Sequence, residues 1–115
     1  MSDPSAPDRR QFRRYHIDVP VRVTRKKTQQ VHFGRGTNMS NGGLQALIAS
    51  ELDLAEEVEI EITMPYYSSQ PLKLPCIVRD REGYKYGLEF QTARQEDREI
   101  VAKACAVLSL IHDHA

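Results

Sequence analysis

Alternation of apolar and polar residues is the feature that most constrains what this chain can fold into. It is clearest from residue 57 to residue 64, in the run Glu-Val-Glu-Ile-Glu-Ile-Thr-Met. Successive side chains of a β-strand point to opposite faces, so this run predicts a strand with one buried and one solvated face. Similar runs occur at residues 18–24, 30–37, 44–48, 72–78 and 84–90. Six such runs without crossover helices predict an antiparallel barrel or sandwich.

Three residues predict irregularities in this sheet. Pro20 cannot donate a backbone hydrogen bond, so its strand lies at an edge or turns that position away from a partner. Gly34 and Gly36 indicate a bulge or a close backbone approach in the second strand.

The C-terminal part of the chain has a helical period instead. Thr92 and Gln95 fit a capping box, and we expect a helix from 93 to 111. Its apolar stripe consists of Ile100, Val101, Ala104, Leu108 and Ile111. We expect this stripe to cover an open end or flank of the strands, in preference to binding a partner.

The length of 115 residues suits one domain with a single core. We divide the chain into a disordered tail at 1–8, an arginine leader at 9–17, the strands at 18–91 and the helix, so that 9–115 form the domain. Cys76 and Cys105 lie far apart in apolar contexts and are expected to be reduced core residues. With no signal peptide or transmembrane run, a cytoplasmic protein is expected.

Charge is unevenly distributed along the chain although the net charge is zero. Residues 9–35 contain nine Lys or Arg and one acid, whereas residues 51–61 contain six acids and no base. This asymmetry predicts one electropositive region on the folded protein, with an ordinary solvated face as the alternative. Arginine in particular suits phosphates and guanine edges, because its planar fork is always charged.

A second stretch, from Thr37 to Gly43, offers small polar side chains and glycines. We interpret it, together with the arginine leader, as one site for anions and bases. Two plainer interpretations remain open. Asn38 and Ser40 can simply hold a turn through backbone hydrogen bonds, and Gly42 and Gly43 can be purely conformational.

These two stretches carry a resemblance to a known family. Arg10-x-x-x-Arg14 followed by Asn38-x-Ser40-x-x-Gly43 resembles the two-part signature of the PilZ domain family. Val78-Arg79 and the run from Tyr86 to Phe90 resemble the family's late hairpin. Ala55 departs from the pattern, since many relatives have glycine before the fourth strand. The resemblance implies a six-stranded antiparallel β-barrel with a C-terminal helix.

It also implies a receptor for cyclic di-GMP, a bacterial second messenger. The residues carried over as ligand contacts are Arg10, Arg14, Asn38, Ser40 and Gly43, with Arg9 as an additional contact. Arginine can bind phosphate or guanine O6 and N7 through two hydrogen bonds, and its plane can stack on a purine. Arg9 and Arg13 share the same spacing, so a register shifted by one residue is the alternative.

Other classes of function fit the sequence less well. No nucleophile–base pair, paired carboxylates or metal cluster indicates an enzyme, a metal site or a cofactor, and His112-Asp113-His114 lacks further ligands. Binding of DNA or RNA would require aromatic residues interleaved with basic ones along a strand. We therefore expect a non-catalytic receptor with no membrane insertion, acting on an unidentified protein partner. A ligand-free adaptor is the alternative, and the choice between monomer and dimer stays open.

Overall fold

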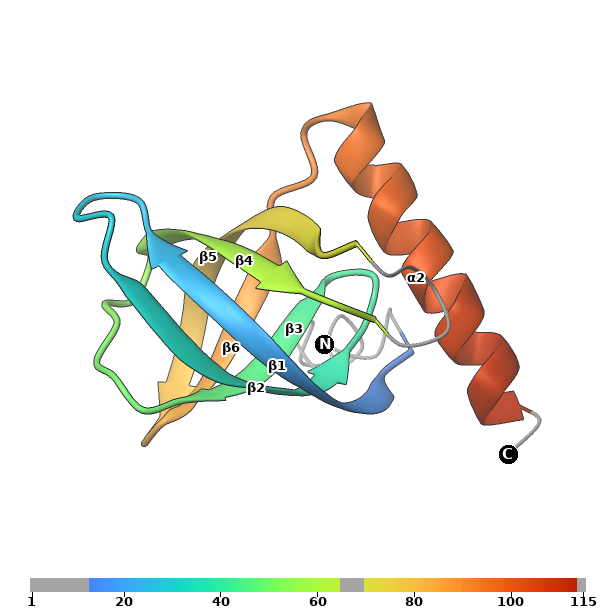
Figure 1. Cartoon of the computed structure of the whole chain (residues 1–115), viewed down its shortest axis with the longest axis horizontal. Helices are drawn as coiled ribbons and strands as arrows, with labels where there is room; N and C mark the ends of the chain where they lie inside the picture. The colour runs from blue at the N-terminus through green and yellow to red at the C-terminus, as the bar shows by residue number, and fades with distance from the viewer. Residues whose placement is uncertain (1–12, 65–69, 114–115) are drawn as a thin grey trace, which may run out of the picture.

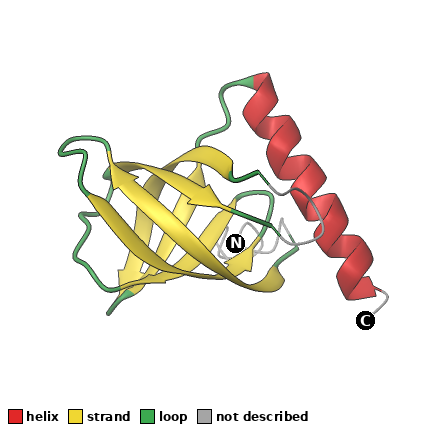
Figure 2. Cartoon of the chain, in the orientation of Figure 1, coloured by secondary structure: helices red, strands yellow, loops and turns green. Residues whose placement is uncertain are grey.

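The computed structural model describes residues 13–64 and 70–113. These residues form six strands and a helix (Figures 1 and 2). The elements are β1 (Tyr15–Arg25), β2 (Val31–Met39), β3 (Gly43–Ile48), β4 (Glu57–Ile62), β5 (Leu72–Glu82), β6 (Lys85–Phe90) and α2 (Gln95–Asp113).

The strands close into a barrel in the order β1-β2-β3-β6-β5-β4, and every neighbouring pair is antiparallel. This confirms the predicted barrel and excludes the sandwich. Pro20 pairs with Arg35 of β2, while the ladder to β4 begins one residue later, at Val21. The prediction for Pro20 is confirmed, because β1 has no partner on its β4 side at that position.

Alternate residues of the strands fill the barrel with an apolar core. Val58, Ile60 and Ile62 of β4 are at most 1% exposed, and their neighbours in the sequence face outward. Figure 1 shows α2 lying across one end of the barrel, where it adds Val101 and Leu108 to the core. The expected covering role of the helix is therefore confirmed.

Both cysteines lie in this core as free thiols. Burial raises the pKa of the Cys105 thiol to about 11, and it raises the pKa of Cys76 further still. A thiol with a raised pKa is a poor nucleophile and a poor metal ligand. Cys76 and Cys105 are therefore small core residues, as the sequence predicted.

Several element boundaries differ from those predicted. β1 begins at Tyr15, so the last three residues of the expected leader belong to the barrel, and β5 continues to Glu82. The helix begins at Gln95, where the carbonyl of Arg94 accepts a bond from the amide of Arg98. The predicted capping box is therefore wrong, since the N-cap position is Arg94 and not Thr92.

The inner face of β2 is built from glycines. A Cβ on Gly34 would lie 2.2 Å from the carbonyl oxygen of Leu47, so the two backbones approach too closely for a larger residue. The register between β2 and β3 shifts between Gly36 and Asn38, which confirms the predicted bulge. Phe33, on the opposite face, is 73% exposed.

Left-handed backbone conformations occur at Gln29, Ala55 and Gly83 among the residues that the structure describes. Ala55 has a φ of 67°, which is unfavourable for a residue with a Cβ. This explains physically why glycine suits the position. Gly42 and Gly43 do not adopt this conformation.

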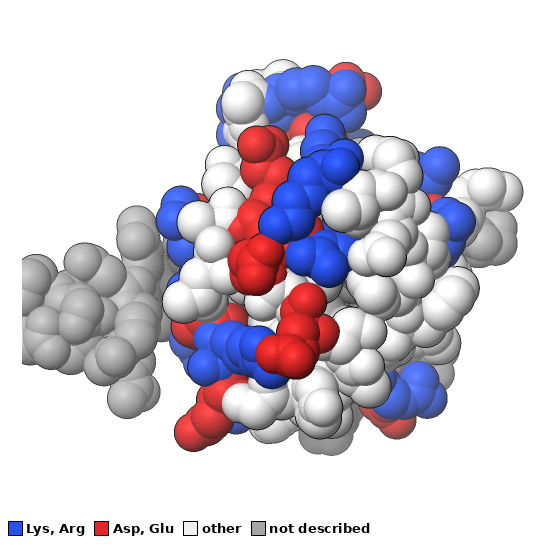
Figure 3. Space-filling model, turned by 90° about the vertical axis from the view of Figure 1, so that its left-hand side faces the viewer, with Lys and Arg blue, Asp and Glu red and all other residues white. Residues whose placement is uncertain are grey.

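The basic and acidic stretches of the sequence meet in space. Because β1 pairs with β4, Nη1 of Arg22 lies 3.5 Å from Oε1 of Glu61, and Nζ of Lys27 lies 2.6 Å from Oδ2 of Asp53. Figure 3 shows blue and red side chains side by side on this surface. The prediction of one electropositive region is wrong for residues 22–35, because their charges are largely balanced by ion pairs.

Candidate functional site

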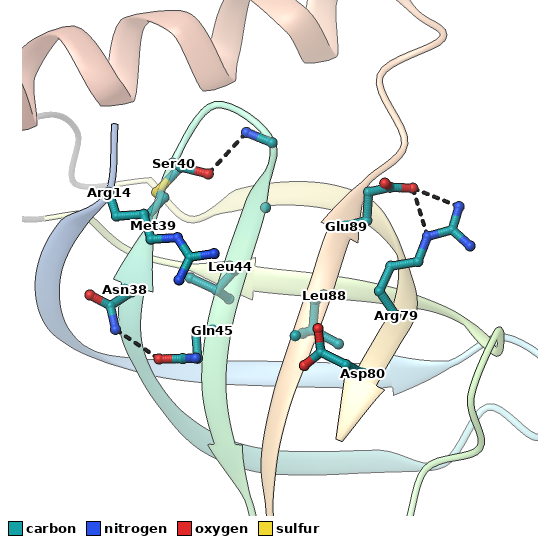
Figure 4. Close-up of a pocket in the computed structure, with 13 residues that line it drawn as sticks. Arg14, Asn38, Met39, Ser40, Leu44, Gln45, Arg79, Asp80, Leu88 and Glu89 are labelled. Atoms are coloured by element: carbon teal, nitrogen blue, oxygen red, sulfur yellow. Dashed lines mark hydrogen bonds and ion pairs between the residues drawn. The ribbon is translucent and has the colours of Figure 1, made fainter. Parts of the chain in front are cut away.

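A surface pocket of about 370 Å³ lies on the outer face of β2, β3, β6 and β5 (Figure 4). Its wall consists of Arg14, Asn38, Met39, Ser40, Gly42, Gly43, Leu44, Gln45, Arg79, Asp80, Gly87, Leu88 and Glu89. Four of the six predicted contacts therefore share one pocket: Arg14, Asn38, Ser40 and Gly43. The other two, Arg9 and Arg10, lie outside the described residues.

Arg14 lies immediately before β1, with its guanidinium over β2 and β3 (Figure 4). Its side chain forms no hydrogen bond or ion pair with any residue of 13–64 or 70–113. Arg13 is directed elsewhere, since its guanidinium carbon lies 5.1 Å from the ring centroid of Tyr15. Of these two neighbours, only Arg14 is part of the pocket wall.

The side chains of the second stretch are already held by hydrogen bonds. Asn38 lies in β2, and its Nδ2 donates to Oε1 of Gln45 at 2.8 Å. The hydroxyl oxygen of Ser40 accepts a bond from the amide of Gly42 at 3.1 Å. The amide of Ser40 donates to the carbonyl of Gly43 at 2.9 Å. Ser40 therefore holds a turn, as the plainer interpretation proposed, and its hydroxyl also lies at the pocket.

Gly43 is required by the packing of the barrel itself. A Cβ at this position would lie 2.3 Å from the carbonyl oxygen of Leu88 in β6. Such a contact is far shorter than a van der Waals distance, so a larger residue would push β3 and β6 apart. The close approach at Gly43 is thus made to a neighbouring strand of the protein.

The opposite wall contains Arg79, Asp80 and Glu89, which belong to neither sequence motif. Arg79 of β5 donates to Oε1 of Glu89 in β6 through Nε at 2.9 Å and Nη2 at 2.7 Å. Asp80 follows Arg79, and Gln45 pairs with Gly87 between the two walls. The late hairpin was noticed in the sequence, but only the barrel shows that it faces Asn38 and Ser40.

Residues 13–64 and 70–113 contain no group of three or more His, Cys, Asp or Glu that could hold a metal ion. Within the same ranges, no helix has the length and apolar character needed to cross a bilayer.

Comparison with known proteins identifies relatives of this chain. The PilZ domain family matches residues 8–106. The PilZ domain of CeSA from a cellulose-synthesizing bacterium is 14% identical, with a TM-score of 0.69 over 87% of this chain and 98% of that one. The PilZ domain of YcgR from Escherichia coli, solved with c-di-GMP, is 13% identical, with a TM-score of 0.73 over 92% and 95%.

A longer protein has the same fold in part. MrkH of K. pneumonia, in complex with c-di-GMP, is 12% identical, with a TM-score of 0.74 over 90% of this chain. This chain spans about half of MrkH, 54% of its length. No curated protein matches this chain.

Proposed function

Because this chain belongs to the PilZ domain family, we propose that it is a receptor that binds cyclic di-GMP in the pocket lined by Arg14, Asn38 and Ser40. One observation carries the proposal. The two sequence motifs, separated along the chain, contribute Arg14 and Asn38 to the wall of the same pocket. Relatives of the same fold, YcgR and MrkH, were solved with c-di-GMP.

The chemistry of the pocket suits this ligand. Cyclic di-GMP combines two phosphodiesters with two guanines. Arg14 offers a guanidinium that no described residue neutralises, and phosphate or a guanine edge can supply the missing acceptors. Asn38 and Ser40 add directional polar groups at one edge of the pocket. In this proposal the protein binds the ligand without catalysis, in the reducing cytoplasm to which its free cysteines are suited.

Isothermal titration of the purified protein with cyclic di-GMP tests the proposal. We expect selective binding, with GTP and linear diguanylate binding much more weakly, and the titration also gives the number of ligands bound. Absence of binding to cyclic di-GMP would leave the fold unchanged and favour the alternative, an adaptor that acts through protein contacts alone.

We further propose that ligand binding orders the arginine leader against the pocket and so creates a surface for a downstream protein. The described end of this leader supports the idea. Arg14 faces the pocket, whereas Arg13 contacts Tyr15, whose ring lies 5.3 Å from that of His112 in α2. A conformational change of the leader would therefore take place next to the C-terminal turn of α2.

Hydrogen–deuterium exchange measures this ordering. Amides of residues 9–14 are expected to exchange more slowly with saturating cyclic di-GMP than without it. The turn between β1 and β2, at residues 26–30, is an internal control because it contains no residue of the pocket wall. Equal exchange of residues 9–14 in both states would refute the switch while leaving the binding proposal intact.

A further inference from the structure

Four pocket residues form a single row across the outer face of the barrel. Asn38 of β2 pairs with Gln45 of β3, Gln45 pairs with Gly87 of β6, and Gly87 pairs with Asp80 of β5. All four line the pocket. The row begins at a residue of the second motif and ends at a carboxylate that neither motif contains (Figure 4).

An irregularity of β5 places Asp80 in this row. Val78 pairs with Leu88, so a regular strand would bring Arg79 opposite Gly87. The register shifts between Val78 and Asp80, and Asp80 takes that position instead. Its carboxylate lies over β6, because a Cβ on Gly87 would be only 2.6 Å and 2.7 Å from its two oxygens. The absence of a side chain at Gly87 is what makes room for the carboxylate.

Among the described residues, no cation balances the Asp80 carboxylate. The neighbouring Arg79 is engaged with Glu89, and Arg81 donates to the carbonyl of Gly83 at 2.7 Å. No hydrogen bond or ion pair connects Asp80 to any residue in the described part of the chain. Arg14, also in the pocket wall, is equally without a partner there.

The wall of the pocket therefore presents a guanidinium and a carboxylate that have no partner within residues 13–64 and 70–113 and that form no ion pair with each other. A purely anionic ligand would be repelled by Asp80. A ligand that combines phosphates with a pair of adjacent N–H donors can satisfy both groups. Guanine has such a pair, N1–H and the 2-amino group, on its Watson–Crick edge. Adenine has an acceptor at N1 and no 2-amino group.

We propose that the two oxygens of Asp80 accept hydrogen bonds from the N1–H and 2-amino groups of one guanine, which makes Asp80 a specificity-determining residue of the pocket. This inference rests on the proposed function, because it assigns a role within the same site. Gln45, whose Oε1 accepts a hydrogen bond from Nδ2 of Asn38 at 2.8 Å, stands between Asn38 and Gly87 in the row.

The role of Asp80 is tested by measuring the binding of two ligands, cyclic di-GMP and an analogue, to wild-type protein and to one variant. Cyclic di-IMP has the same ring and phosphates as cyclic di-GMP but lacks both 2-amino groups. Wild-type protein is expected to bind it about tenfold more weakly, since a hydrogen bond to a charged group is lost. In Asp80→Asn the ratio of the two dissociation constants is expected to fall toward one, because the amide offers one neutral acceptor in place of two charged ones. The ratio is used because the variant also removes a negative charge, which changes the affinity for both ligands alike.

Glu82→Gln is the matched control, because it removes a negative charge from the end of the same strand without changing the pocket wall. It is expected to keep the wild-type ratio. Binding of cyclic di-GMP with an unchanged ratio in Asp80→Asn overturns the role of Asp80 alone. Failure of the wild-type protein to bind cyclic di-GMP at all overturns the proposed function and this inference with it.

Discussion

Replacing Arg14 with alanine is expected to weaken the binding of cyclic di-GMP by about one to two decades in dissociation constant. The reason is that Arg14 has no hydrogen-bonding partner among the described residues and lines the pocket, so its guanidinium is available to a phosphate or a guanine. Loss of one charge-assisted contact costs about 1.5–3 kcal/mol. Isothermal titration of the variant against wild-type protein measures the change.

Arg13→Ala is the matched control, since it removes the same side chain one residue away. Arg13 contacts the ring of Tyr15 and is absent from the pocket wall, so its removal should change the affinity little. Arg14→Lys separates charge from geometry, because lysine retains the positive charge but not the planar fork. A large loss in Arg13→Ala together with no loss in Arg14→Ala would establish the shifted arginine register.

Replacing Glu56 with glutamine is expected to reduce the free energy of unfolding by about 2–3 kcal/mol. Glu56 is 7% exposed and accepts bonds from Nη2 of Arg25 at 2.8 Å and from the amide of Asp53 at 2.9 Å. The variant leaves the largely buried guanidinium of Arg25 without its main partner. Urea unfolding of both proteins measures the difference, and Glu57→Gln, at an exposed neighbour, should change stability little.

This loss should depend on pH. Burial raises the pKa of Glu56, but the hydrogen bonds from Arg25 and from the Asp53 amide outweigh that effect, so its pKa lies below the ordinary 4.5. A carboxyl whose pKa falls on folding adds stability above its unfolded pKa and loses it as the pH falls through the folded value. The difference between wild-type protein and Glu56→Gln should therefore be full at neutral pH and shrink below about pH 4.5. A difference that grew on acidification would contradict the assigned direction.

The strands could be predicted from the sequence because the alternation of apolar and polar residues follows from the geometry of a single strand. Each side of a strand faces either the core or water, so the run around Ile60 identifies a strand without knowledge of its partners. Pro20 and Gly36 were equally informative, since a missing amide hydrogen or a missing side chain restricts the backbone wherever the residue lies. The ends of elements were less predictable. Tyr15 and Ile17 continue the alternation of β1 beyond the predicted start at residue 18, and Tyr15 is buried in the core.

The candidate site was predictable only on one side. Two motifs pointed to Arg14 and Asn38, and the barrel brings both to one pocket. The opposite wall was not predictable, because Arg79 and Asp80 reach it only through the pairing of β5 with β6. Arg9 and Arg10 remain predictions, since they lie outside the described residues.

The sequence by itself determined the local properties of this protein: six strands, the buried faces of those other than β2, the covering helix and the residue types available for an anion and a base. Only the tertiary structure decided which distant residues became neighbours. Pairing of β1 with β4 brought Arg25 to Glu56 and so cancelled a charge asymmetry that was real along the chain. A bulge of one residue put Asp80, not Arg79, opposite Gly87. Register is a property of two strands at once, so no single strand's sequence contains it.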